Sequence, residues 1–238
     1  MIYLNKQKII IRIVCFIFAL LFTVLAYLLT EFKHTAETAG KVYELNTVII
    51  DAGHGGEDGG AVAADGSFEK NYNLSIAKKL NGILKSNGFN VIMTRNDDTM
   101  TCDDGLPTLR QRKVSDIHNR YELTEIYPDS IYVSIHQNKF SDISQKGTQV
   151  FYSGNNVKSK ILADEIQNLI TEKIQPDNKR LTKKSGTEIF ILYHSKIPTV
   201  LVECGFLSNN EDLNNLKKEY YQTQLALLIA EGIIKYKG

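Results

Sequence analysis

Four residues of this sequence could bind a metal or move a proton. His54 lies among glycines in Asp-Ala-Gly-His-Gly-Gly, directly after an apolar run, and His136 ends the run Ile-Tyr-Val-Ser-Ile-His. Glu69 stands at the start of an amphipathic segment. Two histidines and one carboxylate form a ligand set that catalytic zinc uses while a further position stays open for water. His54, Glu69 and His136 therefore suggest a zinc site, although their wide separation gives no spacing signature.

The fourth residue, Glu203, ends the otherwise apolar run Thr-Val-Leu-Val-Glu. A carboxylate in such a place must be paired, bound to a metal or catalytic, because a lone buried charge is costly. Beside a zinc ion, a glutamate can take a proton from water and later deliver it to a leaving nitrogen. An ion pair with a lysine or arginine is the alternative for Glu203.

The other candidates also have structural explanations. A histidine in a Gly-His-Gly turn can be merely structural, and an acidic residue in the first turn of a helix, such as Glu69, complements the helix dipole. His118 lies among charged residues of a helical segment, and His194 follows Tyr193 in a predicted turn. We therefore expect His118 and His194 to be solvated or structural rather than ligands.

A scaffold must bring these strand ends together, and the apolar pattern predicts one. Short apolar runs alternate with helical segments, which favours an α/β domain with helices on both faces of its sheet. Such sheets bind ligands at the carboxyl ends of their strands. The predicted strands cover residues 47–51, 89–94, 131–136, 147–152, 189–192 and 199–203, and the predicted helices cover 73–85, 109–120, 161–170 and 220–236.

The N-terminus differs from the rest of the chain. Lys6, Lys8 and Arg12 precede an uncharged apolar run from Ile13 to Leu29, which at about 17 residues is close to the shortest length that spans a bilayer. The basic residues predict that this end stays in the cytoplasm and that the domain is exported. We expect a membrane anchor or signal peptide at 1–30, a linker at 31–46 and a catalytic domain at 47–238.

Composition limits the partners. The 28 basic and 27 acidic residues nearly cancel and form no large basic block, so nucleic acid is not an expected partner. With 238 residues and 43% hydrophobic content, the chain can bury one sizeable core. Cys102 and Cys204 are far apart in sequence and are expected to be unpaired thiols.

The four motifs together closely resemble the zinc-dependent N-acetylmuramoyl-L-alanine amidases, in order, over residues 46 to 236. The resemblance implies zinc bound by His54, Glu69 and His136, with Glu203 as general base and acid. It implies a mixed sheet of about six strands with helices on both faces. It also implies hydrolysis, outside the cytoplasm, of the amide between N-acetylmuramic acid and L-alanine in peptidoglycan.

Three tracts narrow the resemblance to one subgroup of the family. They are residues 58–62, 109–114 and 147–152. They look like those of germination-specific amidases, which strip stem peptides from spore cortex so that a deacetylase can complete muramic-δ-lactam. The space between the two spore membranes is then the expected location. Many family members instead have proline where this chain has Ala52, and many carry wall-binding modules.

Several alternatives stay open. The chain could be a general vegetative wall amidase, or the same metal site could cleave peptide bonds or deacetylate sugars. A partner-dependent wall-binding subunit with low activity alone is a further alternative, and an activating protein partner is not identifiable from the sequence. Lys179, Arg180, Lys183 and Lys184 are expected to form a solvated loop, with contact to the anionic wall polymer as the alternative.

Overall fold

The computed structural model describes residues 10, 12–31 and 46–237, and the chain divides into two compact units. The first unit contains the helix Arg12–Glu31, which has 20 residues and is long and apolar enough to cross a membrane. A signal sequence meets the same criterion, so both expectations for this segment stand. Lys6, Lys8 and most of the expected linker lie outside the described residues.

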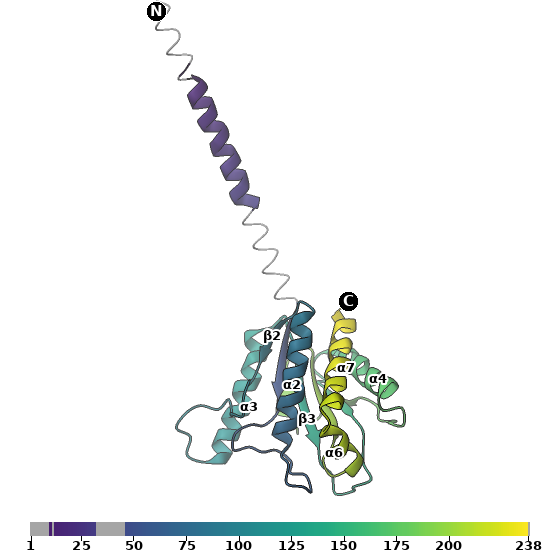
Figure 1. Ribbon diagram of the computed structural model, residues 1–238. Coiled ribbons are helices and arrows are strands. Elements are labelled where there is room, and N and C mark those ends of the chain that lie inside the picture. Colours follow the sequence, from purple (N-terminus) through teal and green to yellow (C-terminus); the bar gives the residue numbers. More distant parts are fainter. Residues whose placement is uncertain (1–9, 11, 32–45, 238) are drawn as a thin grey trace, which may run out of the picture. The chain divides into compact units, whose positions relative to one another are not determined.

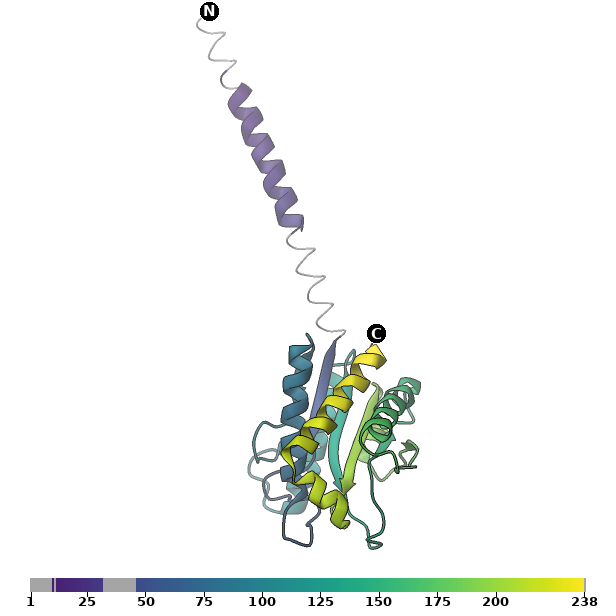
Figure 2. The same ribbon diagram turned by 45° about the vertical axis from the view of Figure 1, so that its right-hand side comes forward.

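The second unit is built on a mixed sheet of six strands (Figures 1 and 2). The strands are β1 Thr47–Ala52, β2 Asn90–Met93, β3 Ile131–Asn138, β4 Gln149–Tyr152, β5 Lys183–Lys184 and β6 Thr199–Phe206. They lie in the order β2-β1-β3-β6-β4-β5. β2, β1, β3 and β6 run parallel, whereas β4 is antiparallel to β6. The carboxyl ends of β1, β3 and β6 therefore lie side by side at the same end of the sheet.

Helices cover both faces of this sheet. α2 (Glu69–Ser86), α4 (Val157–Lys173) and α7 (Glu219–Lys237) lie on one face, where α7 contacts both of the others (Figure 2). α3 (Leu109–Ile126) and the short α5 (Phe190–His194) contact each other on the opposite face, and α6 (Asn210–Leu216) follows β6.

The alternation of side chains along β1 explains the two cores. Val48 and Ile50 belong to the larger apolar cluster under α2, α4 and α7, while Ile49 belongs to a smaller cluster with Tyr132 and Ile191. Every residue of β1 is buried. A strand covered on both faces is mainly apolar, which is why residues 48–50 form a continuous apolar run rather than an alternating pattern.

Most predicted elements are confirmed, and one is wrong. The four predicted helices are present and longer than expected, and five of the six predicted strands are present. Residues 189–192, predicted as a strand, instead enter α5 and bury Ile191 and Leu192. A run of four apolar residues cannot be assigned to strand or helix by periodicity alone. The sixth strand is Lys183–Lys184, so these two lysines belong to the edge of the sheet rather than to a loop.

Candidate metal centre and active site

The structure brings all four candidate residues to the carboxyl ends of the central strands. His54 follows β1, Glu69 is the first residue of α2, and His136 lies in β3 opposite Glu203 of β6. His54, His136 and Glu203 line one pocket of about 300 Å³. The parallel register of β3 and β6 thus places residues 67 positions apart at the same height of the sheet.

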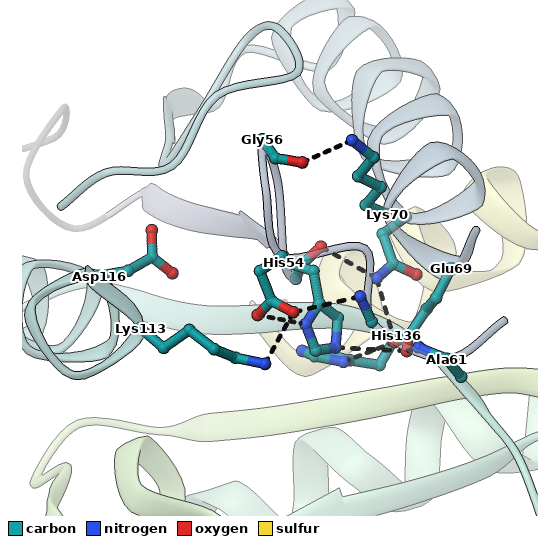
Figure 3. Close-up of polar contacts among 12 residues, drawn as sticks. His54, Gly56, Ala61, Glu69, Lys70, Lys113, Asp116 and His136 are labelled. Atoms are coloured by element: carbon teal, nitrogen blue, oxygen red, sulfur yellow. Dashed lines mark hydrogen bonds and ion pairs between the residues drawn. The ribbon is translucent and has the colours of Figure 1, made fainter. Parts of the chain in front are cut away.

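Glu69 lies between the two histidines (Figure 3). Its Oε1 is 2.9 Å from Nδ1 of His136, and its Oε2 is 3.3 Å from Nε2 of His54. One ligand atom from each of the three residues lies within 4.8 Å of the others. Two imidazole nitrogens and a carboxylate oxygen at this spacing fit a divalent metal ion, and zinc accepts this donor set.

Further polar groups hold the ring of His54 in place. Nδ1 of His54 is 2.8 Å from Oδ2 of Asp58, and Oδ1 of Asp58 is 2.9 Å from Nζ of Lys113. A carboxylate on one ring nitrogen orients a metal-binding histidine and leaves the other nitrogen for the ion. Asp58 therefore directs Nε2 of His54 toward Glu69.

Backbone groups hold the carboxylate of Glu69 in place, and the two histidines keep it ionised. Its Oε2 accepts a hydrogen bond from the backbone nitrogen of Ala61, and its Oε1 accepts one from that of Gln137. Burial would raise the pKa of Glu69, but the two histidines outweigh burial and hold this pKa far below its usual range. For His54, burial favours the neutral ring, yet Asp58 and Glu69 raise its pKa to about 9. A metal ion must therefore compete with a proton at His54, because a histidine has to be neutral to bind an ion.

Two glycines leave room for these side chains. A Cβ at Gly53 would overlap the ring of His136. Gly60 has a φ of +68°, and a Cβ there would lie 2.6 Å from both Oε2 of Glu69 and Cδ2 of His54. Both positions therefore need glycine, because a side chain at either one would displace a candidate ligand.

Glu203 differs from Glu69 in its surroundings. Its Oε2 is buried, and no hydrogen-bond partner for this atom is found in the part of the chain that the structure describes. Burial raises the pKa of Glu203 to about 7, against the opposing charge of His136. The alternative of an ion pair with lysine or arginine finds no partner among the described residues. Glu203 is therefore a buried carboxyl group that faces the pocket and is able to hold a proton near neutral pH.

The two histidines that we do not expect to be ligands lie away from the pocket. The rings of His118 and His194 stack near Phe190, at 4.7 Å and 4.3 Å between centroids. Both histidines are exposed and neither lines the pocket of His54. Cys102 and Cys204 are free, as expected.

Sequence reasoning missed the groups that support the site. Asp58 has one signal in the sequence, namely its position four residues after His54. Arg95 and Arg120, which are buried and contact the His54 loop, carry no local signature at all.

Comparisons with known proteins support the family resemblance of the motifs. A protein family described as N-acetylmuramoyl-L-alanine amidase matches residues 48–235. The germination-specific N-acetylmuramoyl-L-alanine amidase of Bacillus subtilis (strain 168) is 32% identical over 189 residues, covering 79% of this chain and 78% of that protein. The CwlD amidase from Clostridioides difficile, solved in complex with the GerS lipoprotein, is similar with a TM-score of 0.77 and 38% identity, over 80% of this chain and 98% of that one. The amidase AmiC2 of Nostoc punctiforme has a TM-score of 0.67 and 32% identity, over 81% and 97%.

Proposed function

Because the chain belongs to the N-acetylmuramoyl-L-alanine amidase family, which matches its residues 48–235, we propose that it removes stem peptides from muramic acid in spore cortex. Membership of the family makes it an enzyme that hydrolyses the amide between N-acetylmuramic acid and L-alanine in peptidoglycan. Support for the cortex as its substrate comes from the germination-specific relative, whose length the chain covers to 78%.

We further propose that His54, Glu69 and His136 hold a zinc ion. The supporting observation is the convergence of their ligand atoms within 4.8 Å. A bound zinc ion supplies a Lewis acid, which makes water more acidic and stabilises negative charge on a carbonyl oxygen. The protein's own contribution is orientation, because Asp58 holds the ring of His54 and backbone nitrogens hold Glu69.

Glu203 is the proposed general base and acid, and its unpaired Oε2 is the single observation that carries this role. Glu203 takes a proton from the attacking water and then delivers it to the departing nitrogen of L-alanine. A pKa near 7 suits both directions of transfer at neutral pH. Glu69 stays ionised, whereas Glu203 is able to be protonated. Because their surroundings differ in this way, the two carboxylates suit different tasks, namely metal binding for Glu69 and proton transfer for Glu203.

The proposed place of action is supported by the first unit of the chain and by the germination-specific relative. We propose that the helix Arg12–Glu31 acts as an anchor or a signal and that the domain works outside the cytoplasm, between the two spore membranes. The solved complex of the CwlD amidase with the GerS lipoprotein supports a protein partner for this chain as well.

The test compares two substrates, purified spore cortex and purified vegetative wall, each digested with and without a chelator. We expect new alanine amino termini and peptide-free muramic acid from cortex, both abolished by the chelator. New termini at other residues would indicate a peptidase, and free acetate would indicate a deacetylase. Deleting the gene from a spore former should remove muramic-δ-lactam from its cortex. Unchanged lactam together with altered vegetative wall would contradict the cortex role and favour a vegetative autolysin.

A further inference from the structure

The helix α3 buries polar residues, whereas α7 on the opposite face of the sheet buries mostly apolar ones. Its buried residues are Asp116, Arg120 and Thr124. The buried residues of α7, in contrast, are mostly apolar. Replacing buried ion pairs by apolar residues is often neutral or even stabilising, so stability alone does not explain this face of α3. Its contacts supply another explanation.

Arg120 joins α3 to the loop that carries His54. Its guanidinium donates to the backbone oxygens of Ala52 and His54, each at 2.8 Å. It also pairs with Asp51 at the end of β1 and with Asp116 on its own helix. The Arg120 side chain is only 3% exposed, so these contacts are made away from solvent. One side chain thus fixes both the end of β1 and the backbone of His54.

Arg95 completes the same arrangement from the end of β2. It donates to the backbone oxygens of Ala52 at 2.9 Å, Gly53 at 3.2 Å and Lys70 at 2.9 Å. The consecutive carbonyl groups of Ala52, Gly53 and His54 therefore all accept from a buried arginine. The two arginines hold the loop where it has left β1, so its carbonyl groups have defined partners after the strand ends.

His54 is the residue that needs such support. Its φ of 61° lies in the left-handed region, and it is the one non-glycine residue with positive φ in the described part of the chain. This conformation is unfavourable for a residue with a Cβ and persists only where the surroundings over-determine it. Its ring is held by Asp58, which pairs with Lys113 of α3. Lys113 and Arg120, seven residues apart on one face of α3, thus fix the ring and the backbone of His54.

We propose that Arg120 is a positioning residue that holds His54 in its metal-binding conformation, with Arg95 as its counterpart from the other side of the loop. The inference rests on the proposed function in one respect, namely that His54 binds the metal. Arg120 acts through the backbone of His54, so its removal should weaken metal binding as well as catalysis.

The test measures zinc affinity in the full chain by competition with a chelator. Arg120→Gln removes the charge and most donors, and we expect its zinc dissociation constant to rise about 10- to 100-fold, as for other groups that orient metal ligands. Arg120→Lys keeps the charge beside Asp51 and Asp116, but a single nitrogen cannot serve both carbonyl groups, so we expect a rise of about 10-fold. The absorption spectrum of the cobalt-loaded Lys variant should also shift.

Arg110→Gln is the matched control, because Arg110 is an exposed arginine on the same helix. Zinc should raise the melting temperature of this control more than that of the Arg120 variants, since a ligand stabilises according to its affinity. A purely structural Arg120 would lower the melting temperature of the metal-free protein and leave the gain on zinc addition intact.

The outcomes distinguish a failure of the positioning role of Arg120 from a failure of the proposed metal site. If the control binds no zinc, the proposed metal site fails and the inference falls with it. If the control binds zinc and a folded Arg120 variant binds it within twofold of the control, the inference alone is overturned. If Arg120→Gln does not fold, Arg120→Lys decides by the same criterion.

Discussion

At the scale of single residues, Glu203 offers the sharpest test of the proposed chemistry. Glutamine at position 203 keeps the size and hydrogen-bonding capacity of the side chain but cannot accept a proton from water. We expect Glu203→Gln to lower kcat by about 100-fold or more, because a missing general base typically costs this much. Zinc content should stay near one ion per chain. Product release and bound zinc are to be measured on the same sample.

Two other results would assign Glu203 differently. Loss of zinc together with activity would make it a fourth ligand. A lower melting temperature with retained release of stem peptide would leave it a structural role only. Retained activity removes Glu203 from the mechanism.

The three proposed ligands are tested by His136→Ala. The change removes one of three donors, so we expect the purified variant to contain little or no zinc by elemental analysis. His118→Ala is the control, because His118 is exposed and outside the pocket. Equal zinc content in both variants would contradict the assignment of His136.

Asp51 connects the site to the acid stability of the domain. Burial opposes its ionisation, but Arg120 foremost lowers the pKa of Asp51 to about 2 from an ordinary 3.8. A depressed pKa stabilises the folded state above the ordinary pKa, and this stabilisation is lost as pH falls through the folded value. We expect Asp51→Asn to unfold about 2 kcal/mol more easily at pH 7. The difference should shrink between about pH 4 and pH 2, as followed by denaturant melts. A constant difference over this range would show that ionised Asp51 is not the cause.

At the scale of elements, the N-terminus of α3 allows the stability of the fold to be changed without changing the metal site. The side chain of Thr108 caps this helix by accepting from the backbone nitrogen of Gln111, and Gln111 caps the backbone of Thr108 in return. Thr108→Ala should cost about 1 kcal/mol and lower the melting temperature by about 2–4 °C. Arg120 lies three turns further along, so zinc affinity should not change. A weaker zinc site in Thr108→Ala would mean that the whole helix, rather than Arg120, positions His54.

The elements also show what the sequence could predict. β1, β3 and β6 are central strands, and their continuous apolar runs carry a strong local signal. α5 and β5 depend on tertiary contacts, since five and two residues are too few to have a period of their own. The same distinction applies to the site. His54 and His136 stand at strong strands and could be proposed as ligands from the sequence, whereas Arg120 meets Asp51 across 69 positions and leaves no local pattern.

At the scale of the whole molecule, the position of the domain relative to the membrane is testable. Arg12, the first residue of the apolar helix, and the basic residues before it in the sequence predict an external domain. Protease added to intact protoplasts that express the full chain should digest the domain and spare a cytoplasmic marker. A protected domain beside a digested external marker would reverse the orientation.

The strand order governs when the protein can act during its own synthesis. β6 lies between β3 and β4, although it follows both in the chain. The centre of the sheet therefore stays incomplete until residues 199–206 have been made and translocated, and Glu203 arrives with that last central strand. A chain still emerging from the export channel holds His54, Glu69 and His136 but lacks the proposed base. If the domain is exported and Glu203 is the base, as proposed, hydrolysis of the wall waits until the domain has been almost entirely delivered.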